Sequence, residues 1–157
     1  MNCPRCQQPL GPIQHRGVQL EGCKACQGTL VPIPSLAPLL EATSVDLLAS
    51  FDPDTELEAV AVKADDAACP KCGRAMELAD YCGARLVSFD RCNRCSMLWV
   101  GAEELGTMTL MWARMEKRAA RLKAASDEFA AELDAFGRRH GRQAAIARVV
   151  GLALFSL

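Results

Sequence analysis

Two short segments of the chain alternate apolar and polar side chains, and a third, longer segment repeats apolar positions with helical spacing. The alternating segments are residues 17–21 and 85–90, and this period is typical of half-buried β strands. Gly17 and Gly83 stand where a hairpin would turn. We therefore expect a small β ribbon in each half of the chain.

The longer segment predicts a helix. Ten positions recur every three or four residues, and eight of them are large and apolar: Leu105, Met108, Trp112, Met115, Ala119, Leu122, Ser126, Phe129, Leu133 and Phe136. This a/d heptad pattern is typical of helices that form coiled coils. Glu103 and Glu104 suit the start of the helix, and Gly137 suits its end. We expect one helix over residues 102–137, which at 1.5 Å per residue spans roughly 50 Å.

A helix of that length exceeds the width of either ribbon, so its apolar stripe needs a further surface to cover it. A parallel pair would place Arg118 near Lys123 of the partner, which disfavours that arrangement. We expect antiparallel pairing or packing against a short terminal helix at 142–157; an amphipathic helix that folds onto its own chain is the alternative. The small Ala119 and Ser126 would allow close approach. The predicted assembly face consists of Met108, Trp112, Met115, Leu122, Phe129, Leu133 and Phe136.

The segment between the ribbons is acidic, with eight Asp or Glu residues against one lysine over residues 32–68. Its leucines predict one or two short helices over residues 35–50. It is either a solvated connection with a helix packed on a ribbon or a site for a basic partner. The terminal segment 149–155 is apolar, but seven residues fall short of the ~18 needed to cross a membrane. We expect no integral membrane segment.

Nine cysteines in 157 residues are the main chemical feature. The opening Met1–Pro4 lacks the charged and apolar regions of a signal peptide, so we expect a reducing, cytoplasmic environment. Eight cysteines form four C-x-x-C pairs, and gaps of sixteen and nineteen residues fit the spacing of zinc ribbons. Two thiolates on one tight turn reach an ion from one side, and a second turn completes the tetrahedron. The predicted metal ligands are Cys3, Cys6, Cys23 and Cys26 in one set and Cys69, Cys72, Cys92 and Cys95 in the other.

Other uses of these cysteines remain open from spacing alone. Iron also binds four thiolates, and four disulfides would suit a secreted protein. A thioredoxin-like role fits less well, because that motif stands alone at the start of a helix. The ninth cysteine, Cys82, is expected to be a small buried thiol in a hairpin, with a redox or spare-ligand role as the alternative.

The two cysteine sets form an internal repeat. Residues 3–6 match residues 69–72, and residues 26–31 match residues 95–100. Each half resembles the transcription-factor-IIB-type zinc ribbon family of small bacterial proteins, whose pattern begins C-P-x-C and ends C-x-x-C-G-G-x-W-L-D-x-G-E-L. The second copy is closer at its end, where Trp99 and the pair Glu104-Leu105 occupy the family's W and E-L positions. The first copy has Leu30 in place of the tryptophan. The resemblance implies two structural zinc ions, one per ribbon, and by its name a role in transcription.

Charge is unevenly distributed along the chain. The formal net charge is −1, yet residues 111–150 carry nine Lys or Arg against five acids. We expect the basic residues 138–142 to form a loop able to neutralise a few phosphates, with solvated surface as the alternative. Neither His15 nor His140 lies in a recognisable motif, and solvent exposure is expected for both. The residues proposed for nucleic-acid contact are Arg91, Arg94, Trp99, Arg138, Arg139 and Arg142.

Together these patterns predict a small α+β protein with two four-cysteine zinc ribbons, a long coiled-coil-like helix and a short terminal helix. The predicted parts are ribbon 1 (1–31), an acidic linker with a short helix (32–68), ribbon 2 (69–101), the heptad helix (102–137) and a basic loop with an apolar helix (138–157). Four thiolates per ion leave no open position for water or substrate, so we expect no catalysis. The predicted function is a zinc-binding interaction scaffold that assembles with a protein partner or with itself through its C-terminal helices. A nucleic-acid-binding transcription regulator is the alternative.

Overall fold

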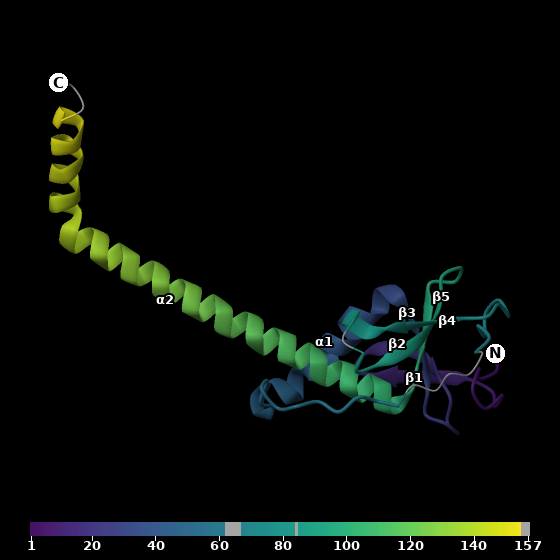
Figure 1. Cartoon of the computed structure of the whole chain (residues 1–157). Helices are drawn as coiled ribbons and strands as arrows, with labels where there is room; N and C mark the ends of the chain where they lie inside the picture. Colours follow the sequence, from purple (N-terminus) through teal and green to yellow (C-terminus); the bar gives the residue numbers. More distant parts are fainter. Residues whose placement is uncertain (62–66, 84, 155–157) are drawn as a thin grey trace. The chain divides into compact units, whose positions relative to one another are not determined.

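The computed structural model describes residues 1–61, 67–83 and 85–154, and the burial of side chains up to Gly141. It divides into two compact units, Met1–Lys117 and Arg118–Leu157. The first unit contains six strands, helix α1 and the beginning of helix α2 (Figure 1). The strands are β1 (Gly11–His15), β2 (Val18–Gly22), β3 (Thr29–Pro32), β4 (Glu77–Asp80), β5 (Ser88–Cys92) and β6 (Met97–Val100), with a 3-10 turn, η1 (Tyr81–Gly83), before β5.

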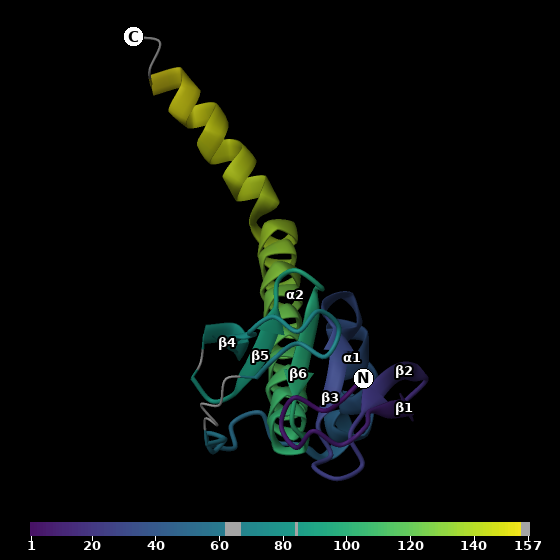
Figure 2. The ribbon, with the colours of Figure 1, turned by 90° about the vertical axis from the view of Figure 1, so that its right-hand side faces the viewer.

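The two predicted ribbons form the halves of a single antiparallel sheet. The strand order is β1-β2-β3-β6-β5-β4, so the last strand of each ribbon pairs with the last strand of the other. The register of β3 and β6 runs from Thr29 opposite Val100 to Pro32 opposite Met97. Figure 2 shows these two strands side by side in the middle of the sheet. The sequence predicts both ribbons but not this pairing.

The pairing of β3 with β6 follows an approximate twofold relation between the ribbons. In the internal repeat Cys26 corresponds to Cys95, and therefore Leu30 corresponds to Trp99. These two equivalent residues lie directly opposite each other in the sheet. Equivalent residues face each other in this way when two identical subunits meet on a symmetry axis. The ribbons thus contact each other as the subunits of a symmetric dimer do, but within one chain.

Both faces of the central strands are buried, and each face belongs to a different core. The helical face contains Leu20, Val31, Leu39, Leu40, Tyr81, Val87, Leu98, Val100, Met108 and Met111. The opposite face contains Cys3, Cys23, Leu30, Cys69, Met76, Cys92, Met97 and Trp99. Side chains alternate along a strand, so neighbours such as Leu30 and Val31 enter different cores. Four of the cysteines, one pair from each ribbon, are therefore part of the hydrophobic interior: Cys3, Cys23, Cys69 and Cys92.

Helix α1 (Ile33–Ser50) begins directly after β3 and agrees closely with the helix predicted over residues 35–50. A proline in its first turn helps to start it, because the missing N–H would have had no partner there. Leu39 and Leu40 are fully buried in the helical core. The linker is thus anchored to the sheet by this helix.

Helix α2 (Ala102–Leu154) begins at the predicted residue but continues past the predicted end. Gly137 does not stop it, and residues 138–141 lie within the helix and not in a loop. A glycine inside a helix costs only about 1 kcal/mol relative to alanine, and no proline follows to enforce a break. Phe136 and His140, one helical turn apart on either side of Gly137, have ring centroids 4.4 Å from each other. Up to Leu154, the last residue whose backbone the structure describes, α2 is one continuous helix, and no separate terminal helix is observed there.

The fold class predicted from the sequence, a small α+β protein with an antiparallel sheet and a long C-terminal helix, is confirmed. Within the described parts of the chain, no helix is both long enough and apolar enough to cross a membrane. The side chains of the apolar segment 149–155 and of Arg142 lie outside the described residues.

Candidate metal centres

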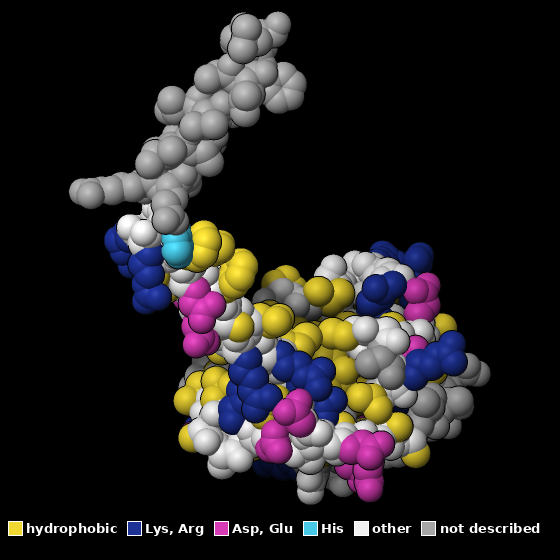
Figure 3. Space-filling view, turned by 60° about the vertical axis from the view of Figure 1, so that its left-hand side comes forward, with side chains coloured by type: hydrophobic (Ala, Val, Ile, Leu, Met, Phe, Trp, Pro, Cys, Tyr) yellow, Lys and Arg dark blue, Asp and Glu magenta, His cyan; other side chains and the backbone are white. Residues whose placement is uncertain are grey.

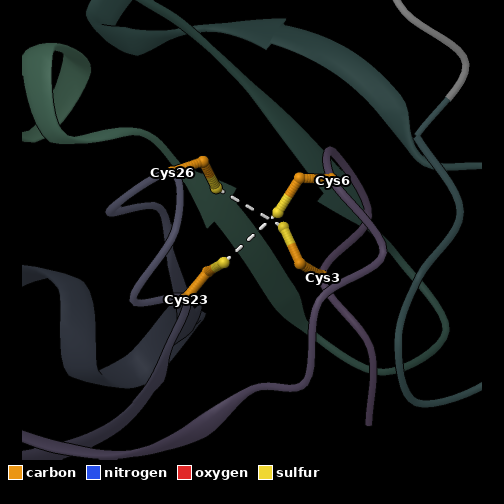
Figure 4. A group of neighbouring side chains, drawn as sticks. All are labelled: Cys3, Cys6, Cys23 and Cys26. Atoms are coloured by element: carbon orange, nitrogen blue, oxygen red, sulfur yellow. Dashed lines mark hydrogen bonds between the residues drawn. The ribbon is translucent and has the colours of Figure 1, made fainter.

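The first cluster brings together the four cysteines of the N-terminal half. Cys3 and Cys6 lie on the turn before β1, while Cys23 and Cys26 lie on the turn between β2 and β3. The sulfur atoms of Cys3 and Cys26 are 3.5 Å apart, and those of Cys6 and Cys23 are 3.4 Å apart. Figure 4 shows the four side chains pointing toward one another from the two turns.

The second cluster repeats this arrangement with the C-terminal cysteines. Cys69 and Cys72 precede β4, and Cys92 and Cys95 flank the turn between β5 and β6. The sulfur atoms of Cys72 and Cys92 are 3.7 Å apart. Within each cluster, all four sulfur atoms lie within 4.8 Å of one another. The structure therefore groups the eight cysteines as the spacing predicts.

These distances fit a four-coordinate zinc ion. A Zn–S bond of about 2.3 Å places the sulfur atoms of a regular tetrahedron roughly 3.8 Å apart. The shortest sulfur separations given above approach this value, whereas a disulfide requires about 2.05 Å. All nine cysteines are free thiols in the structure. Each cluster has the donor set and the size for one zinc ion.

A shared backbone geometry shapes all four cysteine turns. The residue after the second cysteine has a positive φ in each case: 60° at Gln7, 58° at Gln27, 70° at Gly73 and 51° at Ser96. In three of the turns the N–H of this residue donates to the carbonyl of the first cysteine, as Gln27 does to Cys23 at 2.8 Å. The left-handed conformation closes the turn and brings both sulfurs to one side. Only one of the four positions is a glycine, so the other three are strained sites maintained by the fold.

The thiols within a cluster differ in acidity. Burial raises the pKa of Cys3 to about 12, whereas the backbone N–H of Cys26 lowers the pKa of Cys23 to about 6. In the second cluster the backbone N–H of Arg74 lowers the pKa of Cys72 to about 7. The hydrogen bond to Cys72, followed by burial, raises the pKa of Cys95 to about 12. Each cluster thus offers one ready thiolate and at least one thiol that a metal must deprotonate.

An ion pair links the two ribbons beside the first cluster. The guanidinium of Arg5, on the first cysteine turn, donates to the carboxylate of Asp90 in β5 at 2.9 Å. Asp90 is almost fully buried, at 3% exposure. At the equivalent place across the twofold relation, Lys71 and Glu21 line one crevice. Arg5 of the first ribbon thus pairs with an acidic residue of the second, and Lys71 of the second ribbon shares a crevice with an acidic residue of the first.

The residues considered for nucleic-acid contact are divided between the two units of the structure. Trp99 is only 3% exposed and belongs to the cysteine-side core, so it offers no surface to a base. Arg91 is half-buried and lies 3.8 Å from the Glu77 carboxylate, whereas Arg94 is exposed. Arg138 and Arg139 are exposed on α2, where Arg138 lies 3.8 Å from Asp134. The predicted basic loop is thus helical.

The exposure of the ninth cysteine and of the two histidines agrees only in part with the prediction. Cys82 is exposed and not buried, and it has a left-handed backbone conformation in η1, with φ at 55°. His15 is half-buried in β1, and its Nε2 atom has no hydrogen-bond partner. His140 is exposed on α2, as expected.

The predicted assembly face of α2 divides into two parts. Met108 is fully buried and Trp112 packs against the same core, so these two residues serve the fold. Met115, the last of the set within the first unit, is 44% exposed. In the second unit the apolar side chains are open to solvent, and hydrophobic side chains appear along α2 in Figure 3. We call this set the exposed stripe: Leu122 (73% exposed), Phe129 (61%), Leu133 (55%) and Phe136 (64%).

Two features of the site were not predicted from the sequence: the pairing of β3 with β6 and the ion pair of Arg5 with Asp90. A signal for the pairing exists in the sequence. Leu30-Val31 and Met97-Leu98-Trp99-Val100 are uninterrupted apolar runs, which are typical of strands covered on both faces. No local pattern, by contrast, links Arg5 to a carboxylate so far along the chain.

Comparison with known families supports the interpretation of the first ribbon. Residues 2–42 match the family of TFIIB-type zinc ribbons, described as Transcription factor zinc-finger. This range includes the first four cysteines, strands β1–β3 and the first half of α1. Neither curated proteins nor solved structures give a match. The four cysteines gathered on two turns of a three-stranded ribbon agree with this family match, which covers the N-terminal part of the chain, residues 2–42.

Proposed function

We propose that the protein is a non-catalytic, zinc-clamped scaffold. Two structural zinc ions hold the double ribbon as a rigid platform, and α2 binds another protein chain through the exposed stripe. The proposal places the protein in a reducing compartment such as the cytoplasm, because the eight ligands must remain thiolates.

The chemistry of the clusters supports a structural role for zinc. Each cluster supplies four thiolates, which complete a tetrahedron and leave no position for water or substrate. Cys3, Cys23, Cys69 and Cys92 are buried in the interior of the sheet. Binding free energy at such a site becomes folding free energy, since the unfolded chain holds no preformed site.

The observation that carries the assembly role is the change in burial along α2. The same heptad pattern is buried at Met108 and exposed from Leu122 onward. Four large apolar side chains on one face of a helix are costly to leave in water, at about 25 cal/mol per Å². Contiguous exposed apolar surface of this kind marks interaction sites. The periodicity of the stripe specifies a helix as the complementary surface.

Native extracts provide the test. We expect the wild-type protein to migrate in a complex larger than its own 17.0 kDa, and a Leu122→Glu/Phe129→Glu variant to migrate at its own mass. The variant should retain two zinc ions per chain, because the stripe lies away from both clusters in the sequence. Ala124→Glu and Ala131→Glu, on the opposite face of the same helix, are the matched controls. Migration of the wild-type protein at its own mass would contradict the proposal.

The family description favours a second candidate, a transcription regulator that binds nucleic acid through the ribbon surface and the basic residues 138–142. Arg94, Arg138 and Arg139 are exposed and available for phosphate. Fluorescence anisotropy with duplex and single-stranded DNA and RNA, measured over a salt series, tests this function. Micromolar binding near 0.15 M salt with a steep salt slope would favour the regulator. Absence of binding at low salt would leave the scaffold as the function.

A further inference from the structure

The exposed stripe has small residues between its large ones. Along α2 the a positions are Ala119, Ser126 and Leu133, and the d positions are Leu122, Phe129 and Phe136. All of these residues lie in the helical, exposed part of the second unit. The order of sizes limits which helix can cover the stripe.

A second copy of α2 fits the stripe in only one orientation. In a parallel pair, a faces a and d faces d, so a thin Ser126 layer would adjoin a thick Phe129 layer. Two helices at a steady separation of 8–10 Å cannot accommodate such alternation without cavities. In an antiparallel pair, a faces d of the partner, and every layer can combine a small with a large residue or two of middle size.

One antiparallel register uses the whole stripe. Ser126 of one helix then lies opposite Phe129 of the other. The same register places Leu122 opposite Leu133 and Ala119 opposite Phe136. Each of these layers occurs twice, because the pair is symmetric. Every residue of the exposed stripe obtains a partner.

The charges favour the same orientation. Residues 117–123 contain four cations and no acid, whereas residues 127–134 contain four acids and no cation. A parallel pair would place the two basic blocks beside each other and the two acidic blocks beside each other. In the antiparallel register, Arg121 and Lys123 of one helix lie at the height of Asp134 and Glu132 of the other, so blocks of opposite charge share a level along the pair.

The area indicates the strength to expect. Each of the four side chains contributes on the order of 100 Å², and two helices with their flanking alkyl chains bury on the order of 1,000 Å². Interfaces of this size lie at the lower end of specific association. A dissociation constant in the micromolar range is therefore expected.

We propose that the partner of the exposed stripe is a second copy of this chain, bound antiparallel with Ser126 opposite Phe129. This inference rests on the proposed function, which it makes specific. It commits the stripe to self-association, so that each assembly carries four zinc ribbons.

Sedimentation of the full-length, zinc-loaded protein from about 1 to 100 µM tests the self-association. We expect a reversible monomer–dimer equilibrium, weakened at least 100-fold by Phe129→Glu and unchanged by Ala131→Glu. Circular dichroism and zinc content show that each variant is folded. A wild-type protein that stays monomeric at 100 µM overturns the inference; the native-extract experiment then decides the proposed function by itself.

Photo-crosslinking tests the orientation. With Phe136→benzoylphenylalanine, an antiparallel dimer places the reactive ketone beside residues 115–123 of the partner, and mass spectrometry of the crosslinked peptides should find them there. Crosslinks to residues 133–140 of the partner would show a parallel pair and overturn the inference.

Discussion

Gly28 is the position where adding one carbon atom should most clearly disturb the joint between the ribbons. A Cβ at Gly28 would lie 2.3 Å from Cζ2, 2.8 Å from Cε2 and 3.1 Å from Cη2 of Trp99. Ordinary carbon contacts are about 3.5–4.0 Å. The indole ring is 3% exposed, packs in the cysteine-side core and lies on the approximate twofold between the ribbons, so it must shift to admit the added carbon.

The cost of Gly28→Ala follows from that overlap. Overpacking of a filled core typically costs about 1–3 kcal/mol, and three ring atoms inside contact distance indicate the upper half of this range. For a chain of this size, 1 kcal/mol corresponds to roughly 2–4 °C in Tm. We therefore expect Gly28→Ala to lower the Tm by about 4–12 °C.

Denaturant and thermal unfolding of the zinc-loaded protein, followed by circular dichroism, measure the effect. Gly106→Ala is the control, because it lies in α2 with no atom within 4 Å of the added Cβ. That change should stabilise by roughly 0.5–1 kcal/mol through helix propensity. Shrinking the ring should relieve the clash, so Gly28→Ala combined with Trp99→Leu should show a coupling of at least about 1 kcal/mol. Wild-type stability for Gly28→Ala, or purely additive effects in the double variant, would refute the reasoning.

Three further predictions concern the clusters and the joint. Cys72→Ser should reduce the zinc content from two ions to one per chain. Amide exchange of this variant should show faster opening of β3 as well as of β6, because the two strands are paired. The control Cys82→Ser lies outside both clusters and should retain both ions. Zinc binding at pH 7 should release protons, which an indicator dye in weakly buffered solution detects. The pKa of Cys3 and of Cys95 is raised to about 12, so zinc must displace the protons of these two thiols. Zinc affinity should therefore increase with pH. An unchanged dye signal would contradict this. Arg5→Ala should lower the free energy of unfolding by roughly 2–4 kcal/mol, because it removes the cation beside the buried Asp90 carboxylate. The control Arg16→Ala removes an exposed ion pair with Asp46 and should cost less than about 1 kcal/mol in the same denaturation assay.

The sequence predicts well the features that depend on local pattern. The C-x-x-C pairs identify both cysteine groups, and the leucines after residue 35 identify α1 to within two residues at its start. The alternating segments fall on β2 and β5. In each case the residues that determine the structure lie within one turn or one strand of each other.

Features that depend on contacts between distant segments were not predictable in this way. Pairing of β3 with β6 requires two edges to meet from opposite halves of the chain, and alternation within one strand carries no information about its neighbour. Trp99 follows from this pairing: in a ribbon considered alone the ring is a surface residue, but in the joined sheet it is core. Gly137 shows a different cause, since a glycine after a periodic segment suggests a helix end although its cost inside a helix is small.

The junction of β3 and β6 also affects how the chain is made. β3 is complete long before β6 leaves the ribosome, and until then one edge of residues 29–32 presents unpaired N–H and C=O groups. An open edge of that kind pairs readily with another strand, including the same edge of a neighbouring chain. A polypeptide interrupted in α1 or the linker would thus have the means to dimerise through β3, with a second first ribbon in the place of β6. The full chain avoids this by supplying its own covering strand, so the synthesis and pairing of β6 is the step that prevents the first ribbon from pairing with other copies.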